Sequence, residues 1–512
     1  MAKQTFFLML SVLLVISFLS STFAKEYKAA AFEHQPYFVT HIKPPSRAEA
    51  LVIMRRNTAV YSEQAREAFK QGAQIIVFPE DGIYGIDHGR DTIKPYLEPI
   101  PEVSNVSSIN PCIDPQPNTD ILNELSCIAR NNSIALVANM GDIQQCSKSD
   151  PNCPKDGRYQ YNTDVVFDRN GRLLAKYHKQ HLYFEKAFNT PTKCEFVTFV
   201  TLFQVRFGVF TCFDMLFKDP AIDLVQTYGI QNIVFPTAWS HGFPTLISIE
   251  FQQAWSRVNC VNLIAADLYI PDSEFGTGSG IYDCGEPKIY IFNQKLIKKR
   301  LLVATLNGNR NSLNGIRGRQ AKLYRRDNTA SDLDDTFTAK NIEKFPMKQY
   351  KNVDTFKGNV SGNMFTMSKL VSSESEISLC GDHLCCHLNY ALPKGKEFTE
   401  SFALGAFLGE SSNGFYWEVC LLLKCFSSEE SSCGRAVMDS ETVFESFTMT
   451  GNFSSNALVF PTVLGNGFSL LSTNEIKFQE NSISGDALEQ PLLTAALVGR
   501  VFSKDPQPHD RS

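Results

Sequence analysis

The sequence predicts an α/β domain followed by a smaller β-rich domain that is braced by disulfide bonds. Between about Tyr27 and Thr305, short apolar runs alternate with stretches of helical periodicity, as strands and helices do in an α/β fold. After Val353 the apolar runs are strand-like and are separated by Gly, Ser and Asn clusters, which is typical of an antiparallel domain. Six cysteines fall in this second half.

The first half begins with a predicted helix and continues as buried strands. Residues 47–71 show helical spacing of apolar side chains, at Ala48, Leu51, Val52, Met54, Ala59, Ala65, Ala68 and Phe69. The runs expected to form strands are 74–78, 134–139, 164–167, 207–213, 232–235 and 263–266. The pair Asn170-Gly171 between two such runs indicates a hairpin turn. Loops at the ends of buried strands are where an α/β domain places its active site.

The second half is expected to consist of strands, at 402–408, 416–424, 444–449, 457–460 and 492–502. Its cysteines are Cys380, Cys385, Cys386, Cys420, Cys425 and Cys433. They predict three bridges, and the sequence leaves their connectivity open. Between the halves, residues 306–352 form part of a segment of mixed charge that we expect to be a solvated connection. A heparin-type patch is the alternative interpretation.

The remaining eight cysteines raise a question of parity. They are Cys112, Cys127, Cys146, Cys153, Cys194, Cys212, Cys260 and Cys284. If Cys212 is a free thiol, seven remain, so at least one more is unpaired or bonded to another chain. Residues 250–260 have the pattern of an amphipathic helix, and we expect Cys260, at its end, to be this spare and inert thiol.

The amino-terminal segment predicts export from the cell. Residues 1–24 contain Lys3, an apolar run at 6–19, and the small residues Thr22 and Ala24, which together indicate a cleavable signal peptide. The apolar run is shorter than the roughly 20 residues of a membrane-spanning helix. The segment 503–512 is polar, so no lipid-anchor signal is readable and a freely secreted, extracellular protein is expected. Sequons for glycosylation begin at Asn105, Asn131, Asn359 and Asn452.

Composition narrows the classes of function. The chain has 512 residues, of which 43% are hydrophobic and 20% charged, enough for two globular domains with sizeable cores. Its net charge of −5 gives no electrostatic reason to expect nucleic acid or an anionic membrane as a partner. Chemistry on a small molecule remains open.

Three reactive side chains follow apolar strands in the predicted α/β domain. Glu80 comes after the run 74–78, Lys179 ends the run 172–179, and Cys212 ends the run 207–212. Covalent hydrolysis of an amide needs a nucleophile, a proton carrier and a positive group near the developing oxyanion. A thiol, a carboxylate and an ammonium group provide these three functions, and the ammonium is expected to lower the pKa of the thiol.

Each of these residues alone has a plainer interpretation. Cys212 could be a disulfide partner or a core residue, and Glu80 could be a helix cap or a surface acid. Lys179 alone could be a solvated side chain. The hypothesis of a catalytic site therefore depends on the three segments occurring together and in this order.

The combined segments resemble a known superfamily. Residues 78–80 (Phe-Pro-Glu), 176–179 (Lys-Tyr-His-Lys) and 211–214 (Thr-Cys-Phe-Asp) are similar to the Glu-Lys-Cys triad of the nitrilase superfamily. The resemblance narrows to the vanin and biotinidase family through four further segments, 156–163, 235–239, 277–281 and 384–387. The similarity extends from about Tyr27 to Phe502 and is weakest at 295–356.

This resemblance implies an αββα nitrilase-type sandwich followed by a β-rich base domain, with no metal or organic cofactor. The implied segments are a signal peptide at 1–24, a catalytic domain at 25–305, a linker at 306–352 and a base domain at 353–505. Cys212 would be the nucleophile, Glu80 the general base and Lys179 the stabilising cation. The backbone N–H of Phe213 would complete the oxyanion site.

Two further residues have implied roles that compete with plainer ones. Glu185 matches the position of a second glutamate that orients the lysine in nitrilases, and a surface acid is the alternative. Trp239 resembles a pocket wall, and a core tryptophan is the alternative.

The resemblance implies two substrates. Vanins cleave pantetheine to pantothenate and cysteamine, whereas biotinidase releases biotin from biocytin. Segments 159–167, 177–179 and 422–425 are more vanin-like, and segments 78–83 and 493–497 are closer to biotinidase. Ile86 and Ser240 stand where relatives usually have an aromatic residue and a methionine, which leaves the fit of substrate open.

We expect pantetheine to be the substrate, with biocytin as the alternative. A different class remains conceivable, a secreted binding or signalling protein on an inactivated nitrilase scaffold. The presence of all three triad residues argues against that class.

Overall fold

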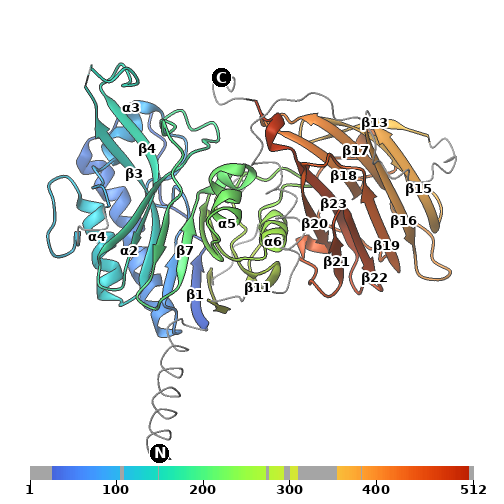
Figure 1. Cartoon of the computed structure of the whole chain (residues 1–512), viewed down its shortest axis with the longest axis horizontal. Helices are drawn as coiled ribbons and strands as arrows, with labels where there is room; N and C mark the ends of the chain where they lie inside the picture. Colours follow the sequence, from blue (N-terminus) through green and yellow to red (C-terminus); the bar gives the residue numbers. More distant parts are fainter. Residues whose placement is uncertain are drawn as a thin grey trace, which may run out of the picture. The chain divides into compact units, whose positions relative to one another are not determined.

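A computed structural model of the chain describes residues 26–103, 109–147, 149–271, 276–292, 300–308, 354–381 and 383–506. The expected signal peptide, the sequon at Asn105 and positions 309–352 of the expected linker lie outside these residues. Within them the chain divides into two compact units (Figure 1). Among the helices that can be described, none is long and apolar enough to span a bilayer.

The first unit contains two six-stranded sheets that face each other, since β1 contacts β9 and β2 contacts β8. The first sheet has the order β12-β1-β2-β3-β4-β5, with β1 Glu26–Phe32, β2 Ile75–Val77, β3 Ala135–Gln145, β4 Arg158–Phe167, β5 Leu173–His178 and β12 Leu301–Asn307. The second has the order β11-β10-β9-β8-β7-β6, with β6 Thr198–Val200, β7 Arg206–Val209, β8 Asn232–Thr237, β9 Asn262–Asp267, β10 Gly280–Asp283 and β11 Glu286–Tyr290.

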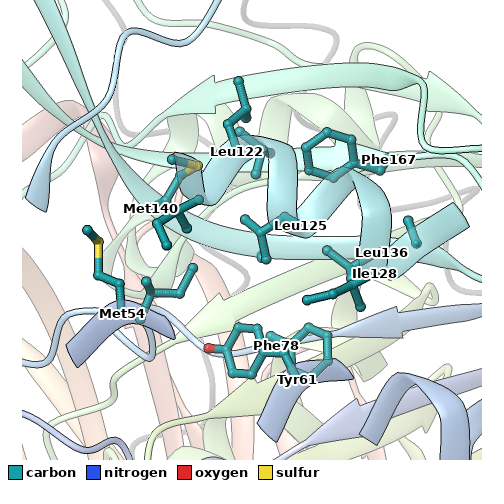
Figure 2. Close-up of a cluster of buried hydrophobic side chains, with 14 of the residues drawn as sticks. Met54, Tyr61, Phe78, Leu122, Leu125, Ile128, Leu136, Met140 and Phe167 are labelled. Atoms are coloured by element: carbon teal, nitrogen blue, oxygen red, sulfur yellow. The ribbon is translucent and has the colours of Figure 1, made fainter. Parts of the chain in front are cut away.

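Helices cover the outer faces of this pair of sheets. They are α2 Arg47–Lys70, α3 Arg90–Ile93, α4 Asp120–Asn131 and α5 Asp223–Gln226, with short helical turns η1 Lys94–Tyr96, η2 Cys212–Leu216 and η3 Lys218–Ile222. Helices α2 and α4 pack on the first sheet, where Figure 2 shows Tyr61 of α2 against Phe78, in one cluster with Leu122 and Leu125 of α4. Leu224 of α5 packs at Gly208 of β7 in the second sheet. The predicted αββα sandwich is thereby confirmed.

Helix α2 starts where its sequence provides a cap. The Ser46 hydroxyl accepts from the Glu49 N–H at 3.3 Å, and the Glu49 carboxylate accepts from the Ser46 N–H at 2.7 Å, which is a capping box. The predicted helix 47–71 is confirmed to within one residue. Its predicted inner face is partly wrong, because Ala48, Val52, Ala59 and Phe69 are exposed.

The hairpin predicted at Asn170-Gly171 is confirmed. Strands β4 and β5 pair antiparallel, and the Asp168 carboxylate accepts from the N–H groups of Asn170 at 2.8 Å and Arg172 at 3.0 Å. Gly171 has a φ of 84°, which the turn requires and which glycine adopts at no steric cost. The hairpin directs β5 back across the sheet, so that its last residue immediately precedes Lys179.

The second unit contains an antiparallel β-sandwich. One sheet has the order β13-β14-β17-β18-β23-β20, with β13 Phe356–Val360, β14 Asn363–Lys369, β17 Phe402–Glu410, β18 Tyr416–Lys424, β20 Leu458–Gly465 and β23 Leu492–Arg500. The other has the order β15-β16-β19-β22-β21, with β15 Glu374–Gly381, β16 Leu384–Ala391, β19 Ser446–Gly451, β21 Ile476–Gln479 and β22 Ser482–Asp486. The predicted β-rich character of this half is confirmed.

Short elements complete the second unit. They are helix α6 Ser248–Asn259 and the turns η4 Glu430–Ser432, η5 Asn466–Phe468 and η6 Phe502–Lys504. Helix α6 packs on β20, where the rings of Phe251 and Phe460 are 5.2 Å apart.

All fourteen cysteines are described, and twelve of them form disulfides. In the second half the pairs are Cys380–Cys385, Cys386–Cys420 and Cys425–Cys433, so the predicted three bridges are confirmed. The other pairs are Cys112–Cys127, Cys146–Cys153 and Cys260–Cys284. Two thiols are free, Cys194 and Cys212, as parity predicted.

The identity of the spare thiol was predicted wrongly. Cys260 is bonded to Cys284, and the second free thiol, in addition to Cys212, is Cys194. Helix α6 ends at Asn259, and Cys260 adopts a left-handed conformation with φ 46° as its C-cap. The prediction of an inert, buried thiol assumed that Cys260 belongs to the helix. Cys260 lies just beyond the helix end, so the direction of its side chain does not follow the helical periodicity.

Candidate active site

Glu80 lies just beyond the end of β2. The ring of Phe78, between the strand and Glu80, stacks on Tyr61 of α2 with centroids 3.8 Å apart. The Glu80 side chain is buried and accepts three hydrogen bonds. One carboxylate oxygen accepts from Lys179 Nζ at 2.6 Å and from Asn162 Nδ2 at 2.8 Å, and the other accepts from the Ala238 N–H at 3.0 Å. Three donors from three different segments fix the orientation of this carboxylate.

Lys179 follows β5 directly and is buried. Its backbone N–H donates to the Asn162 carbonyl at 2.9 Å, and its ammonium donates to both Glu80 and Glu185. Burial disfavours the charged ammonium, but the Glu185 and Glu80 carboxylates outweigh it and hold the pKa of Lys179 well above its ordinary value. Lys179 is therefore a fixed positive charge within the site.

Glu185 lies in the loop after Lys179. Its carboxylate accepts from the Lys179 ammonium, from Asn162 Nδ2 at 2.8 Å and from the Tyr183 N–H at 3.1 Å. Burial raises the pKa of Glu185, against the positive charge of Lys179. The structure thus brings the predicted second glutamate to the lysine, and the catalytic role of Glu185 stays a prediction.

Cys212 begins the turn η2, three residues after Val209, the last residue of strand β7. It has a left-handed backbone with φ 45°, a conformation that costs a non-glycine residue free energy and that is found at active sites. Burial and the negative charge of Glu80 raise the pKa of the Cys212 thiol well above its ordinary value, although Lys179 acts in the opposite direction. Lys179 lowers the pKa of the thiol, as predicted, but burial and Glu80 outweigh this effect.

A cavity of about 330 Å³ connects these side chains to solvent. It is lined by Glu80, Asp81, Tyr84, Gly85, Ile86, Asp87, His88, Lys179, Tyr183, Phe184, Glu185, Ala187, Phe188, Cys212 and Ala238. The cavity has the size of a small-molecule site and is lined by Cys212, Glu80 and Lys179, for which the sequence predicted the roles of nucleophile, base and cation. Among the residues that can be described, no group of acidic, histidine and cysteine side chains is arranged to hold a metal ion.

The remaining predicted site residues, Phe213 and Trp239, each follow directly a residue that lines this cavity, Cys212 and Ala238. The Phe213 ring packs against Tyr183, with centroids 5.0 Å apart. Trp239 is buried, its backbone N–H donates to the Asp267 carboxylate at 3.0 Å, and its ring meets that of Phe235 edge-on. Trp239 is not among the residues that line the cavity. An oxyanion role for Phe213 and a pocket role for Trp239 stay predictions.

The three described sequons have exposed asparagines. Asn131 ends α4, Asn359 lies in β13, and Asn452 follows β19. Their glycosylation stays a prediction.

Three contributors to the site are not marked by any motif in the sequence. Asn162 binds both glutamates, the Ala238 N–H binds Glu80, and Asp81 lines the cavity. A backbone N–H leaves no trace in a sequence. Asn162 could have been noticed, because polar residues alternate at 160, 162 and 164 along what proved to be a longer strand than the predicted 164–167.

Comparisons with known proteins identify the family of the chain. The family described as "Carbon-nitrogen hydrolase" matches residues 53–248, and the family described as "Vanin C-terminal domain" matches residues 354–505. A Mus musculus protein named Pantetheinase is 40% identical over 489 residues, which cover 94% of this chain and 90% of that protein. A Mus musculus protein named Biotinidase is 36% identical over 505 residues, covering 94% of each.

Among solved structures, an amidase from Nesterenkonia sp. is 21% identical and covers 60% of this chain and 98% of its own, with a TM-score of 0.41. The sequence matches define the class of protein, a hydrolase that acts on carbon–nitrogen bonds of amides. The chain belongs to the vanin and biotinidase family.

Proposed function

We propose that this protein is secreted and hydrolyses the linear amide of pantetheine, with Cys212 as nucleophile. The observation that carries the proposal is the convergence of Glu80, Lys179 and Cys212 in one cavity. A relative named Pantetheinase, similar over nearly the whole chain, supports this choice of substrate. Six disulfides support an oxidising, extracellular location.

In the first half of the proposed reaction, the Cys212 sulfur attacks the amide carbonyl carbon while Glu80 accepts the thiol proton. The carbonyl oxygen becomes an oxyanion, which the Lys179 ammonium and the Phe213 N–H stabilise. Collapse of this intermediate breaks the carbon–nitrogen bond. Glu80 returns the proton to the leaving amine, and the acyl group remains on Cys212 as a thioester.

In the second half, water takes the place of the departed amine. Glu80 accepts a proton from the water as its oxygen attacks the thioester carbonyl carbon. Collapse breaks the carbon–sulfur bond, the acid leaves, and the proton returns to the Cys212 sulfur. The two halves use the same carboxylate as base and then as acid.

The raised pKa of Cys212 explains why the base is needed. A thiol with a raised pKa is neutral at neutral pH, so its proton must leave during attack. The buried Glu80 carboxylate, with Lys179 beside it, provides a base in the same cavity. Proton transfer and attack are therefore expected to be concerted.

Biocytin is the second candidate substrate, favoured by the 36% identity to a relative named Biotinidase over 94% of the chain. Purified protein is to be incubated separately with pantetheine and with biocytin, and kcat/KM measured for each. We expect the value for pantetheine to exceed that for biocytin by at least about tenfold, a difference of roughly 1.4 kcal/mol.

Cys212→Ala and Cys194→Ala are the matched variants for this comparison, because both remove a free thiol. Hydrolysis is expected to be lost in the first and retained in the second. Cleavage of biocytin alone would overturn the choice of substrate, and activity in Cys212→Ala would overturn the mechanism.

A further inference from the structure

Three polar side chains lie together on strands β3 and β4, beneath the candidate site. In the antiparallel register Asn139 of β3 is opposite Asp164 of β4, and Asn162 is two residues from Asp164 on the same strand. Alternate residues of a strand face the same side, so Asn162 and Asp164 share a face. All three are at most 1% exposed. Buried polar groups of this kind must be hydrogen-bonded or they destabilise the fold.

Every hydrogen-bonding position of the Asn139 amide is used. Its Nδ2 donates to Asn162 Oδ1 at 2.6 Å and to Asp164 Oδ1 at 2.9 Å. Its Oδ1 accepts from the Asp81 N–H at 3.1 Å and from the Tyr84 hydroxyl at 3.3 Å. Because both donors and the acceptor are committed, the amide has one orientation.

That orientation determines which way the next amide points. Asn162 Oδ1 faces the donor of Asn139, so Asn162 Nδ2 must face away from it. Nδ2 donates to Glu80 and to Glu185, at 2.8 Å in each case. A reversed Asn162 would place an oxygen against two carboxylates, which is electrostatically unfavourable.

The third side chain extends the connection to the nucleophile. Asp164 Oδ2 accepts from the Thr211 hydroxyl at 2.7 Å, and Thr211 directly precedes Cys212. The Thr211 N–H donates to Asp214 at 3.1 Å, so Thr211 is held from both sides. A continuous set of hydrogen bonds thus joins the carboxylate pair to the residue before the thiol.

We propose that Asn139, Asn162 and Asp164 are positioning residues, which together set the orientation of the Glu80 carboxylate and the place of Cys212 relative to it. They act through their neighbours and need not touch the substrate. The inference deepens the proposed function and rests on it for the assignment of Glu80 and Cys212 as base and nucleophile.

The electrostatics of the site agree with this role. Burial raises the pKa of Glu185, and the hydrogen bond from Asn162 is among the interactions that lower it. Burial also raises the pKa of Asp164 to about 7, against the hydrogen bonds from Thr211 and Asn139. The titratable groups around the two amides and Asp164 are Glu80, Asp81, Tyr84, Lys179, Glu185 and Asp214. Loss of the Asn162 amide therefore favours protonated carboxyls.

The first test is Asn162→Leu, which keeps the size of the side chain and removes its donors. We expect kcat for pantetheine to fall about 10²-fold, the effect of a small misplacement of reacting groups, with KM changed less than about threefold. The acid limb of the pH profile of kcat/KM is expected to move to higher pH. Asn232→Leu is the matched control, since Asn232 is also a buried asparagine of this unit, but its side chain bonds Tyr27, the Arg206 carbonyl and Asn262 instead of Glu80 and Glu185.

A second pair of variants isolates the other end of the connection. Thr211→Val removes only the hydroxyl, and Thr211→Ser restores it. Reduced kcat in the valine variant and recovery in the serine variant are expected. This pair decides the question if Asn162→Leu does not fold.

A readout without substrate separates this inference from the proposed function. The rate at which iodoacetamide alkylates Cys212 is to be measured against pH, and its acid limb is expected to shift to higher pH in Asn162→Leu. A wild-type protein that cleaves neither pantetheine nor biocytin would sink the proposed function while this shift still supports the positioning role. Equal behaviour of Asn162→Leu and Asn232→Leu in both pH profiles, or of Thr211→Val and Thr211→Ser in kcat, would overturn it.

Discussion

The thiol of Cys212 and the ammonium of Lys179 are buried in the same site, but they differ in whether their neighbours favour ionisation. Burial opposes ionisation of both, but Lys179 has two carboxylates that restore its charge, whereas Cys212 has the carboxylate of Glu80 beside it. A sequence shows that a lysine and a cysteine are present, and it predicts a lowered thiol pKa from the lysine alone. Only the folded structure shows how deeply Cys212 is buried and that the Glu80 carboxylate lies near it as well as Lys179.

One prediction at the residue scale concerns Phe184, which lines the cavity with a left-handed backbone of φ 55° and a 74% exposed side chain. Asparagine tolerates this conformation far better than an aromatic residue does. Phe184→Asn is therefore expected to raise the free energy of unfolding by about 1 kcal/mol. It is also expected to raise KM for pantetheine about tenfold, which corresponds to the loss of roughly 1.4 kcal/mol of apolar contact.

Urea unfolding and steady-state kinetics check this prediction. Phe426→Asn is the control, because Phe426 is a 56% exposed phenylalanine that does not have a left-handed backbone and does not line the cavity. It is expected to leave KM unchanged without adding stability. The same response from both variants would contradict the argument.

The candidate site itself was predictable at this scale only where side chains form motifs. Glu80, Lys179 and Cys212 follow strands in a recognisable order, and the structure places them in one cavity. Asn162 lies on a fourth segment with no motif of its own. The Ala238 N–H that holds Glu80 is a backbone group, which any residue other than proline could provide.

At the scale of elements, helix α2 illustrates what periodicity predicts and what it misses. The helix was predicted to within one residue, but its inner face is defined partly by polar residues. The Asn57 amide donates to the Tyr37 and Ile83 carbonyls, at 2.8 and 2.9 Å, and the Thr58 hydroxyl donates to Glu124 of α4. Because the buried face was predicted from apolar residues only, these buried polar side chains were left out of it. The predicted face therefore included Val52, which is exposed.

The cap of α2 gives a prediction about stability. Ser46→Ala removes the hydroxyl that accepts from the Glu49 N–H and is expected to lower the free energy of unfolding by about 1 kcal/mol. Ser62→Ala, the same substitution in the middle of the same helix, is the control and is expected to be neutral or slightly stabilising, because alanine has the higher helix propensity. Urea unfolding of both variants checks this, and equal losses would show that the cap contributes nothing.

Strand β5 gives a prediction about pH, because its last residue, His178, lies between two carboxylates. His178 Nε2 is 3.0 Å from Asp142 and Nδ1 is 2.8 Å from Glu195. Burial opposes the charged imidazole, but the hydrogen bonds with Asp142 and Glu195 outweigh it and raise the pKa of His178 above its ordinary value. A raised histidine pKa stabilises the fold fully below the unfolded pKa of about 6.5, and this contribution is lost as the pH rises through the folded pKa.

His178→Gln cannot titrate in this range. The difference in Tm between wild type and His178→Gln is therefore expected to be largest near pH 5.5 and to shrink toward pH 9. Thermal unfolding across that range checks the sign. A difference that stays constant with pH, or that grows as the pH rises, would contradict the assignment of a charged His178.

At the scale of the whole molecule, the sequence predicted the fold class and the number of disulfides in the second half, but not which cysteines pair. Alternation of strands and helices followed by strands alone predicted an α/β sandwich and a β-rich half, and both are present. The number of bridges in the second half followed from six cysteines in an expected secreted chain. Which cysteines pair depends on strand register, such as the opposition of Cys380 and Cys385 in the β15–β16 hairpin, and register is not readable from spacing.

The bridges of the second half are expected to differ in their contributions to stability. Cys386 and Cys420 are 34 residues apart and join β16 of one sheet to β18 of the other, whereas Cys380 and Cys385 are 5 residues apart. Loop-closure entropy predicts a loss of about 4 kcal/mol when the first pair is changed to alanine and about 2 kcal/mol for the second. Unfolding of the two double variants in guanidinium chloride compares them, and an equal loss would contradict the argument from loop length.

The central claim is that Cys212 forms a thioester with the acyl group of the substrate. It is tested most directly by mixing the protein with pantetheine, quenching in acid during turnover, and locating the adduct by peptide mass spectrometry. We expect the pantothenoyl group on the peptide that contains Cys212, and none on the peptide of the other free thiol, Cys194. Turnover with an adduct on another residue, or undiminished hydrolysis by Cys212→Ala, would contradict the account.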